Sequence, residues 1–153
     1  MTQRGGSPAL ALHPQQRAFI ERRGALSRQI GMPKSTFRVM GLLGVCQPAE
    51  QSAQVIQATL GLSTGSVSIA LTTLTKLQMV ERLRLPNERP YYYRLNPDGF
   101  KRALELRLHI TTQAKYDVDT MAQLDPVNER LEKWRDFYAL EQTSIHDVLA
   151  KMQ

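Results

Sequence analysis

The chain has 153 residues, 42% of them hydrophobic, which is enough for one packed domain with or without dimerising extensions. Lys and Arg outnumber Asp and Glu by 20 to 14, and the formal net charge of +6 favours a polyanionic partner such as nucleic acid. The single cysteine excludes an intramolecular disulfide, and the absence of any run of ~20 apolar residues excludes a membrane-spanning helix. The N-terminus also lacks a signal-peptide core, so we expect a cytoplasmic protein with no membrane partner.

The N-terminal third is predicted to be a tail followed by two helices. Residues 1–13 are predicted to be disordered, because the glycines and Pro8 at their start offer little to bury. A helix is expected at 14–30, with Pro14 in its first turn and Gly31 at its end. A second helix is expected at 33–46, where two glycines permit close packing of a neighbour. We assign residues 14–47 to dimerisation and scaffold.

The central segment has the order helix, tight turn, helix and two short strands. Gly61 suits the turn because it tolerates a left-handed backbone, and Ser63 is a good N-cap for the helix that follows. The apolar spacing and strand propensities predict helices at 49–60 and 64–78 and strands at 79–85 and 91–95, with a charged loop at 86–90. This order is typical of a winged helix-turn-helix, which lays one helix in the major groove of DNA while a hairpin touches the backbone beside it. We assign residues 48–96 to this domain.

The C-terminal third is predicted to be two long helices, at about 98–123 and 127–151, separated at Asp125–Pro126. We assign residues 97–153 to dimerisation. The predicted fold class is therefore mainly α (α+β): a winged helix-turn-helix with N- and C-terminal dimerisation helices.

The second helix of the motif carries Ser and Thr where an ordinary surface helix would carry Glu, Lys and Arg. These residues are mediocre helix formers, so a requirement for close approach to base edges explains them better than propensity does. In the wing, Arg89 stands between two prolines that would project its guanidinium outward. We predict DNA contacts by Ser63, Thr64, Gly65, Ser66, Ser68, Thr72, Thr73, Lys76, Arg82, Arg84 and Arg89.

Two residues of this region have alternative interpretations. Ile69 lies on the same helix face and either touches a thymine methyl group or packs under the wing, with packing slightly preferred. Arg94 either contacts DNA or forms a scaffold salt bridge, and the sequence favours neither.

These segments resemble the MarR-type winged-helix regulators, and within them the GbsR-like branch. The similarity covers about residues 28–96 and is carried by Q-P-A-E-Q-S at 47–52, L-G-L-S-T-G-S-V-S at 60–68, L-Q-M-V-E-R at 77–82, Arg89 and the tyrosines at 91–93. The resemblance implies a homodimeric bacterial transcription factor whose terminal helices form the dimer interface. It also implies that Thr64, Ser66, Ser68 and Thr72 face the major groove. The chain departs from the family pattern at Gln57, where a small residue is usual.

The terminal helices contain more apolar side chains than a winged domain of this size can cover. The side chains that need a partner surface are Phe19, Leu104, Leu108, Leu131, Trp134, Phe137, Tyr138, Ile145 and Leu149. A twofold dimer would bury them and present two recognition helices about one DNA turn apart, which predicts a pseudopalindromic operator. A monomer whose helices fold back is the alternative.

Sites other than the DNA interface are weakly indicated. His109, Tyr116 and Trp134 are candidates for a small-molecule effector pocket, although such residues are more often plain core. The three histidines have no metal-ligand spacing, so neither metal nor cofactor is expected. Cys46 is either an oxidant sensor or, as we prefer, a buried structural thiol.

The sequence thus predicts a homodimeric, sequence-specific, double-stranded DNA-binding transcriptional regulator, by family resemblance a repressor, with a small-molecule effector as an optional partner. An enzyme is not expected, because no phosphate loop, catalytic triad or paired carboxylates with a pocket are found. The alternative is a winged-helix protein–protein interaction module that does not bind DNA.

Overall fold

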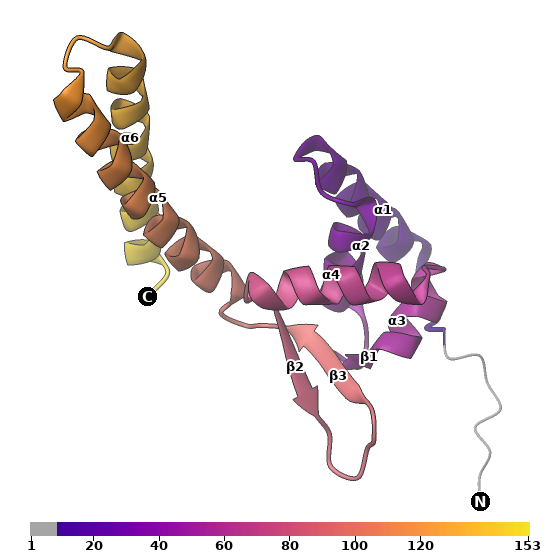
Figure 1. Ribbon diagram of the computed structural model, residues 1–153. Helices are drawn as coiled ribbons and strands as arrows, with labels where there is room; N and C mark the ends of the chain where they lie inside the picture. The colour runs from indigo at the N-terminus through magenta and orange to yellow at the C-terminus, as the bar shows by residue number, and fades with distance from the viewer. Residues whose placement is uncertain (1–8) are drawn as a thin grey trace, which may run out of the picture. The chain divides into compact units, whose positions relative to one another are not determined.

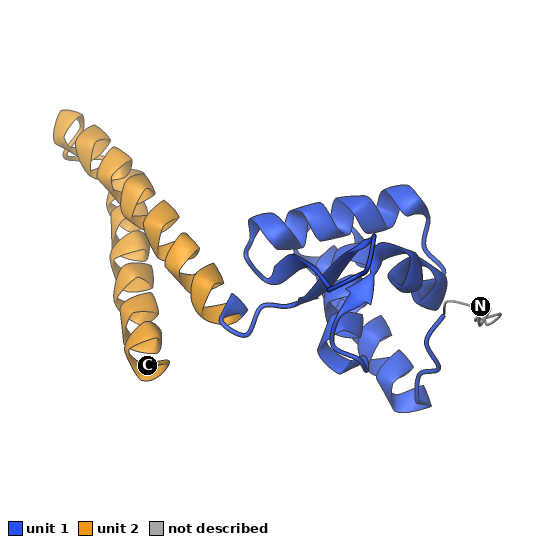
Figure 2. Cartoon of the chain, turned by 90° about the horizontal axis from the view of Figure 1, so that it is seen from below, with its two compact units in different colours: residues 1–99 blue, residues 100–153 orange. Residues whose placement is uncertain are grey.

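The computed structural model describes residues 9–153, so the first eight residues of the expected tail lie outside the described part. The chain divides into two compact units, one ending at Gly99 and the other comprising Phe100–Gln153 (Figure 2). The elements in chain order are α1 (Pro14–Gln29), α2 (Lys34–Val45), β1 (Gln51–Ser52), α3 (Ala53–Leu60), α4 (Thr64–Lys76), β2 (Val80–Arg84), β3 (Tyr91–Leu95), α5 (Gly99–Leu124) and α6 (Glu129–Lys151).

Helices α1 and α2 form the packed pair expected from the sequence. His13 caps α1 through a side chain that accepts from the Gln15 amide, and Pro14 occupies the first turn. At Gly41, an added Cβ would lie 3.4 Å from the Ile20 Cα, so the predicted close packing at this glycine is confirmed. The expected tail extended to residue 13, but the Leu10 amide donates to Thr59 Oγ1 at 2.9 Å, which holds this part of the segment against α3.

The first helix of the motif begins four residues later than predicted. Gln51 and Ser52 form a two-residue strand, β1, that pairs with Tyr93 and Tyr92 of β3. The Ser52 hydroxyl then accepts from the Val55 amide at 3.3 Å and caps α3. The prediction of a helix from 49 was therefore wrong at its start, because a two-residue strand leaves no sequence period and Pro48 also suits a first helical turn.

The three strands form an antiparallel sheet in the order β1-β3-β2. Arg82 pairs with Tyr93 and Arg84 with Tyr91, so these four side chains share one face of the β2–β3 hairpin. The hairpin projects beyond α4 as a wing (Figure 1). The mostly helical first unit with its small sheet confirms the predicted winged helix-turn-helix fold.

The core of the first unit lies where α2, α3 and α4 meet the sheet. Its most buried apolar side chains come from all of these elements and from α1; they are Ile20, Val39, Leu42, Ile56, Val67, Ala70, Leu74 and Val80. Cys46 is buried beside this core, and burial raises the pKa of its thiol. A raised pKa disfavours the reactive thiolate, which supports the structural interpretation of this cysteine.

The second unit is a helical hairpin in which α5 and α6 lie side by side and antiparallel (Figures 1 and 2). Asn128 ends the turn between them, because its side-chain oxygen accepts from the amides of Arg130 and Leu131. Val118, Ala122 and Ile145 are buried between the helices. Thr111 is also buried, and its hydroxyl donates to Glu141 at 2.6 Å, so a polar contact is built into this small core.

Two global properties can be read from the described residues. Between residues 9 and 153 no single helix is long and apolar enough to cross a membrane; α3 and α4 pass that test only as a pair bent by 118°. The same residues contain no cluster of three His, Cys, Asp or Glu side chains that could hold a metal ion.

Gly61 and Gly65 make opposite predictions for the same substitution. Gly61 ends α3 with a φ of +63°, whereas Gly65 is in the first turn of α4 with nothing within 4 Å of an added Cβ. Because an L-residue is strained in the left-handed region, Gly61→Ala is expected to lower the free energy of unfolding by about 1 kcal/mol. Gly65→Ala is expected to leave it unchanged or raise it by up to about 1 kcal/mol. Urea unfolding of both variants checks this, and equal destabilisation by the two would contradict it.

Candidate nucleic-acid interface

The outer surface of α4 consists of short, uncharged polar side chains. Val67, Ala70, Leu71 and Leu74 are buried on the inner side of the helix. The exposed residues are Thr64, Gly65, Ser68, Ile69, Thr72, Thr75 and Lys76. The helix contains no acidic residue, and Lys76 in its last turn is its only charge. Such a surface can approach a polyanion closely without repulsion.

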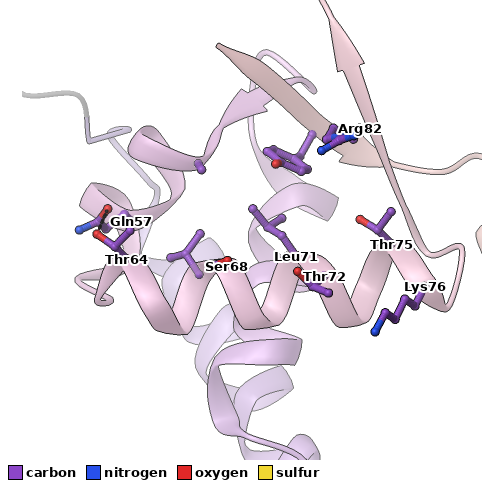
Figure 3. A pocket seen from close by; sticks show the side chains of 11 residues that line it. Gln57, Thr64, Ser68, Leu71, Thr72, Thr75, Lys76 and Arg82 are labelled. Atoms are coloured by element: carbon purple, nitrogen blue, oxygen red, sulfur yellow. Dashed lines mark hydrogen bonds between the residues drawn. The ribbon is translucent and has the colours of Figure 1, made fainter.

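A groove of about 540 Å³ lies beside α4, between α3 and the sheet (Figure 3). It brings together five of the predicted DNA contacts: Thr64, Ser68, Thr72, Lys76 and Arg82. Gln57 and Thr64 meet at one end, whereas Thr75, Lys76 and Arg82 lie toward the other. The groove thus joins the recognition helix to the first strand of the wing along one continuous polar border.

Gln57 is a groove residue that sequence reasoning did not assign. Its side-chain oxygen accepts from the Thr64 hydroxyl at 3.2 Å, which links α3 to the first residue of α4. The bond leaves the Gln57 amide nitrogen available to a ligand in the groove. The departure from the family pattern at this position was the only sequence signal for it.

Ser63 and Ser66 have a structural task at the start of α4. Ser63 Oγ accepts from the Ser66 amide at 3.1 Å and donates to Ser66 Oγ at 2.9 Å. The predicted N-cap is therefore confirmed. Because Ser66 is half-buried and takes part in this cap, it is less accessible to a ligand than Ser68.

The wing presents two arginines stacked on one tyrosine. The guanidinium carbons of Arg82 and Arg84 lie 4.2 and 4.0 Å from the centre of the Tyr91 ring. A hydrogen bond with Arg84, reinforced by the charges of Arg84 and Arg82, lowers the pKa of the Tyr91 hydroxyl. Arg84 also donates to the backbone carbonyl of Arg89 at the wing tip. Tyr91 was missed by the sequence analysis because only the strand register places it between the two arginines.

The charges on this wing face are not neutralised by the protein. Within residues 9–153, no carboxylate forms a salt bridge with Arg82, Arg84 or Arg89. Arg94, on the other sheet face, differs: it pairs with Glu81 at 2.9 Å and Glu50 at 3.5 Å. Of the two uses considered for Arg94, the structure shows the scaffold salt bridge. Three arginines of the wing remain free to bind an external anion.

Comparison with known proteins agrees with this geometry. No protein-family model matches the sequence. The chain is 26% identical over 156 residues to the HTH-type transcriptional regulator MmpR5 of Mycobacterium tuberculosis, and the match spans 99% of this chain and 94% of that protein. It also resembles the crystal structure of a transcriptional regulator with a TM-score of 0.78 and 25% sequence identity, covering 91% of this chain and 98% of the other. The chain is similar to transcriptional regulators over nearly its whole length.

One expectation for the recognition helix was wrong. Ile69 was expected to pack under the wing, but its side chain is 60% exposed. Helical spacing explains the difference, because Ile69 is about 160° around the axis from the buried Val67 and Leu71 side. Thr73, another predicted DNA contact, is half-buried at the edge of this exposed surface.

The residues predicted to form a dimer interface fall into two groups. Ile145 is buried inside the α5–α6 hairpin, so its assignment to a partner surface was wrong. The half-buried side chains, which are partly covered by their own chain, are Phe19, Leu104, Leu108, Leu131, Tyr138 and Leu149. Trp134 and Phe137 are more than half exposed and remain candidates. The sequence could not tell which apolar positions the second helix of the hairpin would cover.

The predicted effector residues do not form a pocket within one chain. Tyr116 and Trp134 are 72% and 51% exposed, and His109 is exposed as well. None of these three residues lines any of the cavities found beside α4, under β3 or near Cys46. An effector site at these residues therefore requires a further surface to enclose it.

Proposed function

We propose that this protein is a homodimeric, sequence-specific DNA-binding transcriptional regulator that acts as a repressor at a pseudopalindromic operator. The observation that carries the proposal is the pairing of an acid-free recognition helix with three wing arginines that no described carboxylate neutralises. The resemblance to transcriptional regulators supports the coarser part, regulation through DNA. The MarR-type resemblance, with its GbsR-like branch, supports the finer part.

In this proposal α4 enters the major groove and the wing binds the adjacent backbone. Thr64, Ser68 and Thr72 approach base edges, because their side chains are short, exposed and on the groove side of α4. Arg82 and Arg84 bind phosphates, which supply affinity without sequence information. Lys76 adds a cation at the end of the helix nearest the wing.

The hairpin supports a homodimer through an apolar face that its own chain leaves uncovered. On α6 this face contains Trp134, Phe137, Leu140 and Val148, which are 51%, 53%, 70% and 46% exposed. On α5 it contains Ile110, Met121 and Leu124, which are all more than half exposed. We call these seven residues the hairpin apolar face. A face of this size is unfavourable in water unless a partner covers it.

Helix geometry places both parts of this face on one side of the hairpin. On each helix the exposed apolar row is about 100° around the axis from the row that packs against the other helix. Because the helices are antiparallel, the same rotation on each brings both rows to the same side. The opposite side is polar: Arg135 and Lys115 bind Asp119, and Gln142 donates to Thr112. This asymmetry supports a second copy packing against the hairpin apolar face.

A twofold dimer of this kind presents two α4 helices to one face of DNA, which requires two inverted half-sites about one helical turn apart. Bound across a promoter, it blocks polymerase by occupancy. A small-molecule effector releases it only if the ligand binds the DNA-free form more tightly. His109, Tyr116 and Trp134 are proposed for that site, where the second copy supplies the missing wall.

The proposal is tested by selecting duplexes from a random library with the purified full-length chain. The selected duplex and a scrambled control of the same composition are then compared by fluorescence anisotropy at two salt concentrations. We expect an inverted repeat, an affinity for it at least about a thousandfold higher than for the scrambled duplex, and weaker binding at high salt. Equal affinity for both duplexes at both salts would reject DNA regulation and favour the protein–protein module.

A further inference from the structure

Ile69 is a large apolar side chain at the middle of the outer surface of α4, and it is 60% exposed. The other exposed large hydrophobic residues described in the first unit are placed differently: Leu26 and Ile30 belong to the end of α1, and Tyr91 is covered by two arginines. Ile69 alone stands among the residues proposed to read bases. The established core does not use it, and neither the groove nor the wing contacts assign it a task.

The helix period places Ile69 on the row of α4 that projects furthest from the core. Gly65, Ile69, Thr72 and Lys76 follow one another at intervals of four, three and four residues, so they form a single row. At Gly65, nothing lies within 4 Å of an added Cβ, so the surface beside Ile69 is open on that side. Thr72 and Lys76 are exposed on the other side. A duplex that receives α4 in its major groove therefore meets Ile69 near the centre of the contact.

The chemistry of the major groove restricts what an isoleucine can contact there. Base edges present hydrogen-bond donors and acceptors, and the thymine C5-methyl group is the apolar exception among the four bases. Opposite a G·C pair, Ile69 would desolvate polar edge atoms without bonding to them, which is unfavourable. Opposite a thymine, two apolar groups are removed from water together. The side chain therefore discriminates in favour of a thymine at one position.

We propose that Ile69 is a specificity-determining residue that contacts the C5-methyl group of one thymine in each half-site. The inference rests on the proposed function, because it requires α4 to lie in the major groove. It adds a property of the operator: a T·A pair opposite the centre of α4. A 5-methylcytosine at the same position presents the same methyl group and is expected to substitute for thymine in part.

The test removes the two contacting methyl groups separately and together. Each thymine of the selected duplex is replaced in turn by deoxyuridine, which lacks only the C5-methyl, and affinities are measured for the full-length protein and for Ile69→Ala. At one position in each half-site, the wild-type protein is expected to lose about fourfold in affinity per methyl removed. Ile69→Ala is expected to bind the thymine duplex more weakly and to show equal affinity for thymine and uracil at that position.

Two further variants keep the interpretation specific. Ile69→Val retains a branched apolar side chain and is expected to keep part of the preference for thymine. Ser68→Ala, which alters the neighbouring exposed side chain, is expected to keep the full preference. Thermal unfolding of each variant shows that the fold is intact, as expected for substitution of residues exposed on α4.

The possible results separate the two levels of the argument. If a duplex is selected but uracil has the same effect on wild type and Ile69→Ala, or no effect on either, the assignment of Ile69 is overturned while DNA regulation stands. If no duplex is enriched at all, the proposed function fails and the assignment fails with it. Loss of uracil sensitivity at one symmetric position in Ile69→Ala alone supports the assignment.

Discussion

Phe137→Glu is expected to convert the protein into monomers and to weaken operator binding by about a hundredfold or more. Phe137 is 53% exposed at the middle of the hairpin apolar face. In the proposed dimer a carboxylate there would be buried without a partner, which is strongly unfavourable. Each monomer keeps one intact recognition helix, but the operator no longer binds two linked helices at once. The lost avidity accounts for the size of the effect.

Sedimentation equilibrium and anisotropy on the selected duplex measure the two consequences. Ala139→Glu is the matched control, because it adds the same charge to the same helix only two residues away. Ala139 is exposed and lies on the polar side of the hairpin, so this variant is expected to remain dimeric and to bind DNA normally. If Phe137→Glu stays dimeric at micromolar concentration, the hairpin apolar face is not the interface and the proposed dimer is wrong.

The local rules that specify the helices were sufficient to predict the motif from the sequence. Gly61 and Ser63 act within a few residues of their own positions, as turn and cap, and both predictions were confirmed. The strand β1 was missed because its two residues are defined only by pairing with β3, 40 residues further along. Gln57 and Tyr91 were missed for a related reason: their roles depend on which side chains the fold brings beside them.

The same limit explains the mixed outcome for the hairpin. Periodicity identifies an apolar side chain, but α5 and α6 each carry two apolar rows, one facing the neighbouring helix and one facing outward. Ile145 belongs to the inner row and Leu140 to the outer row, although both suit a buried position by composition. Only the packing of the two helices distinguishes the row that the chain covers itself from the row that it leaves exposed.

Arg84→Ala is expected to reduce the salt dependence of operator binding in a countable way. Each phosphate contact contributes about 0.9 to the slope of log affinity against log salt, and a dimer carries each wing arginine twice, so the slope should fall by about 1.8. Arg82→Ala combined with Arg84→Ala should lower it by about 3.6 and weaken binding at physiological salt by about a hundredfold. The operator sequence selected by the double variant should not change, because phosphate contacts carry no base information.

Anisotropy titrations at several salt concentrations give these slopes directly. Arg94→Gln is the matched control, since Arg94 belongs to the same wing but is bound to Glu81 and Glu50 on the other sheet face. Its slope should equal that of the wild type. An equal fall in the slope for Arg94→Gln and Arg84→Ala would mean that net charge alone is measured, and it would contradict a phosphate contact by Arg84.

Tyr91 decides whether the wing arginines act as a positioned pair. Its ring lies about equally close to both guanidinium groups, which limits the rotamers that either side chain can adopt before DNA is bound. Tyr91→Phe keeps the ring and is expected to bind nearly as tightly as wild type, whereas Tyr91→Leu is expected to weaken binding with an unchanged salt slope. An unchanged slope means that the phosphate contacts still form, so the loss reflects the entropy of ordering two flexible arginines. A reduced slope in Tyr91→Leu would instead show that the contacts themselves depend on the ring.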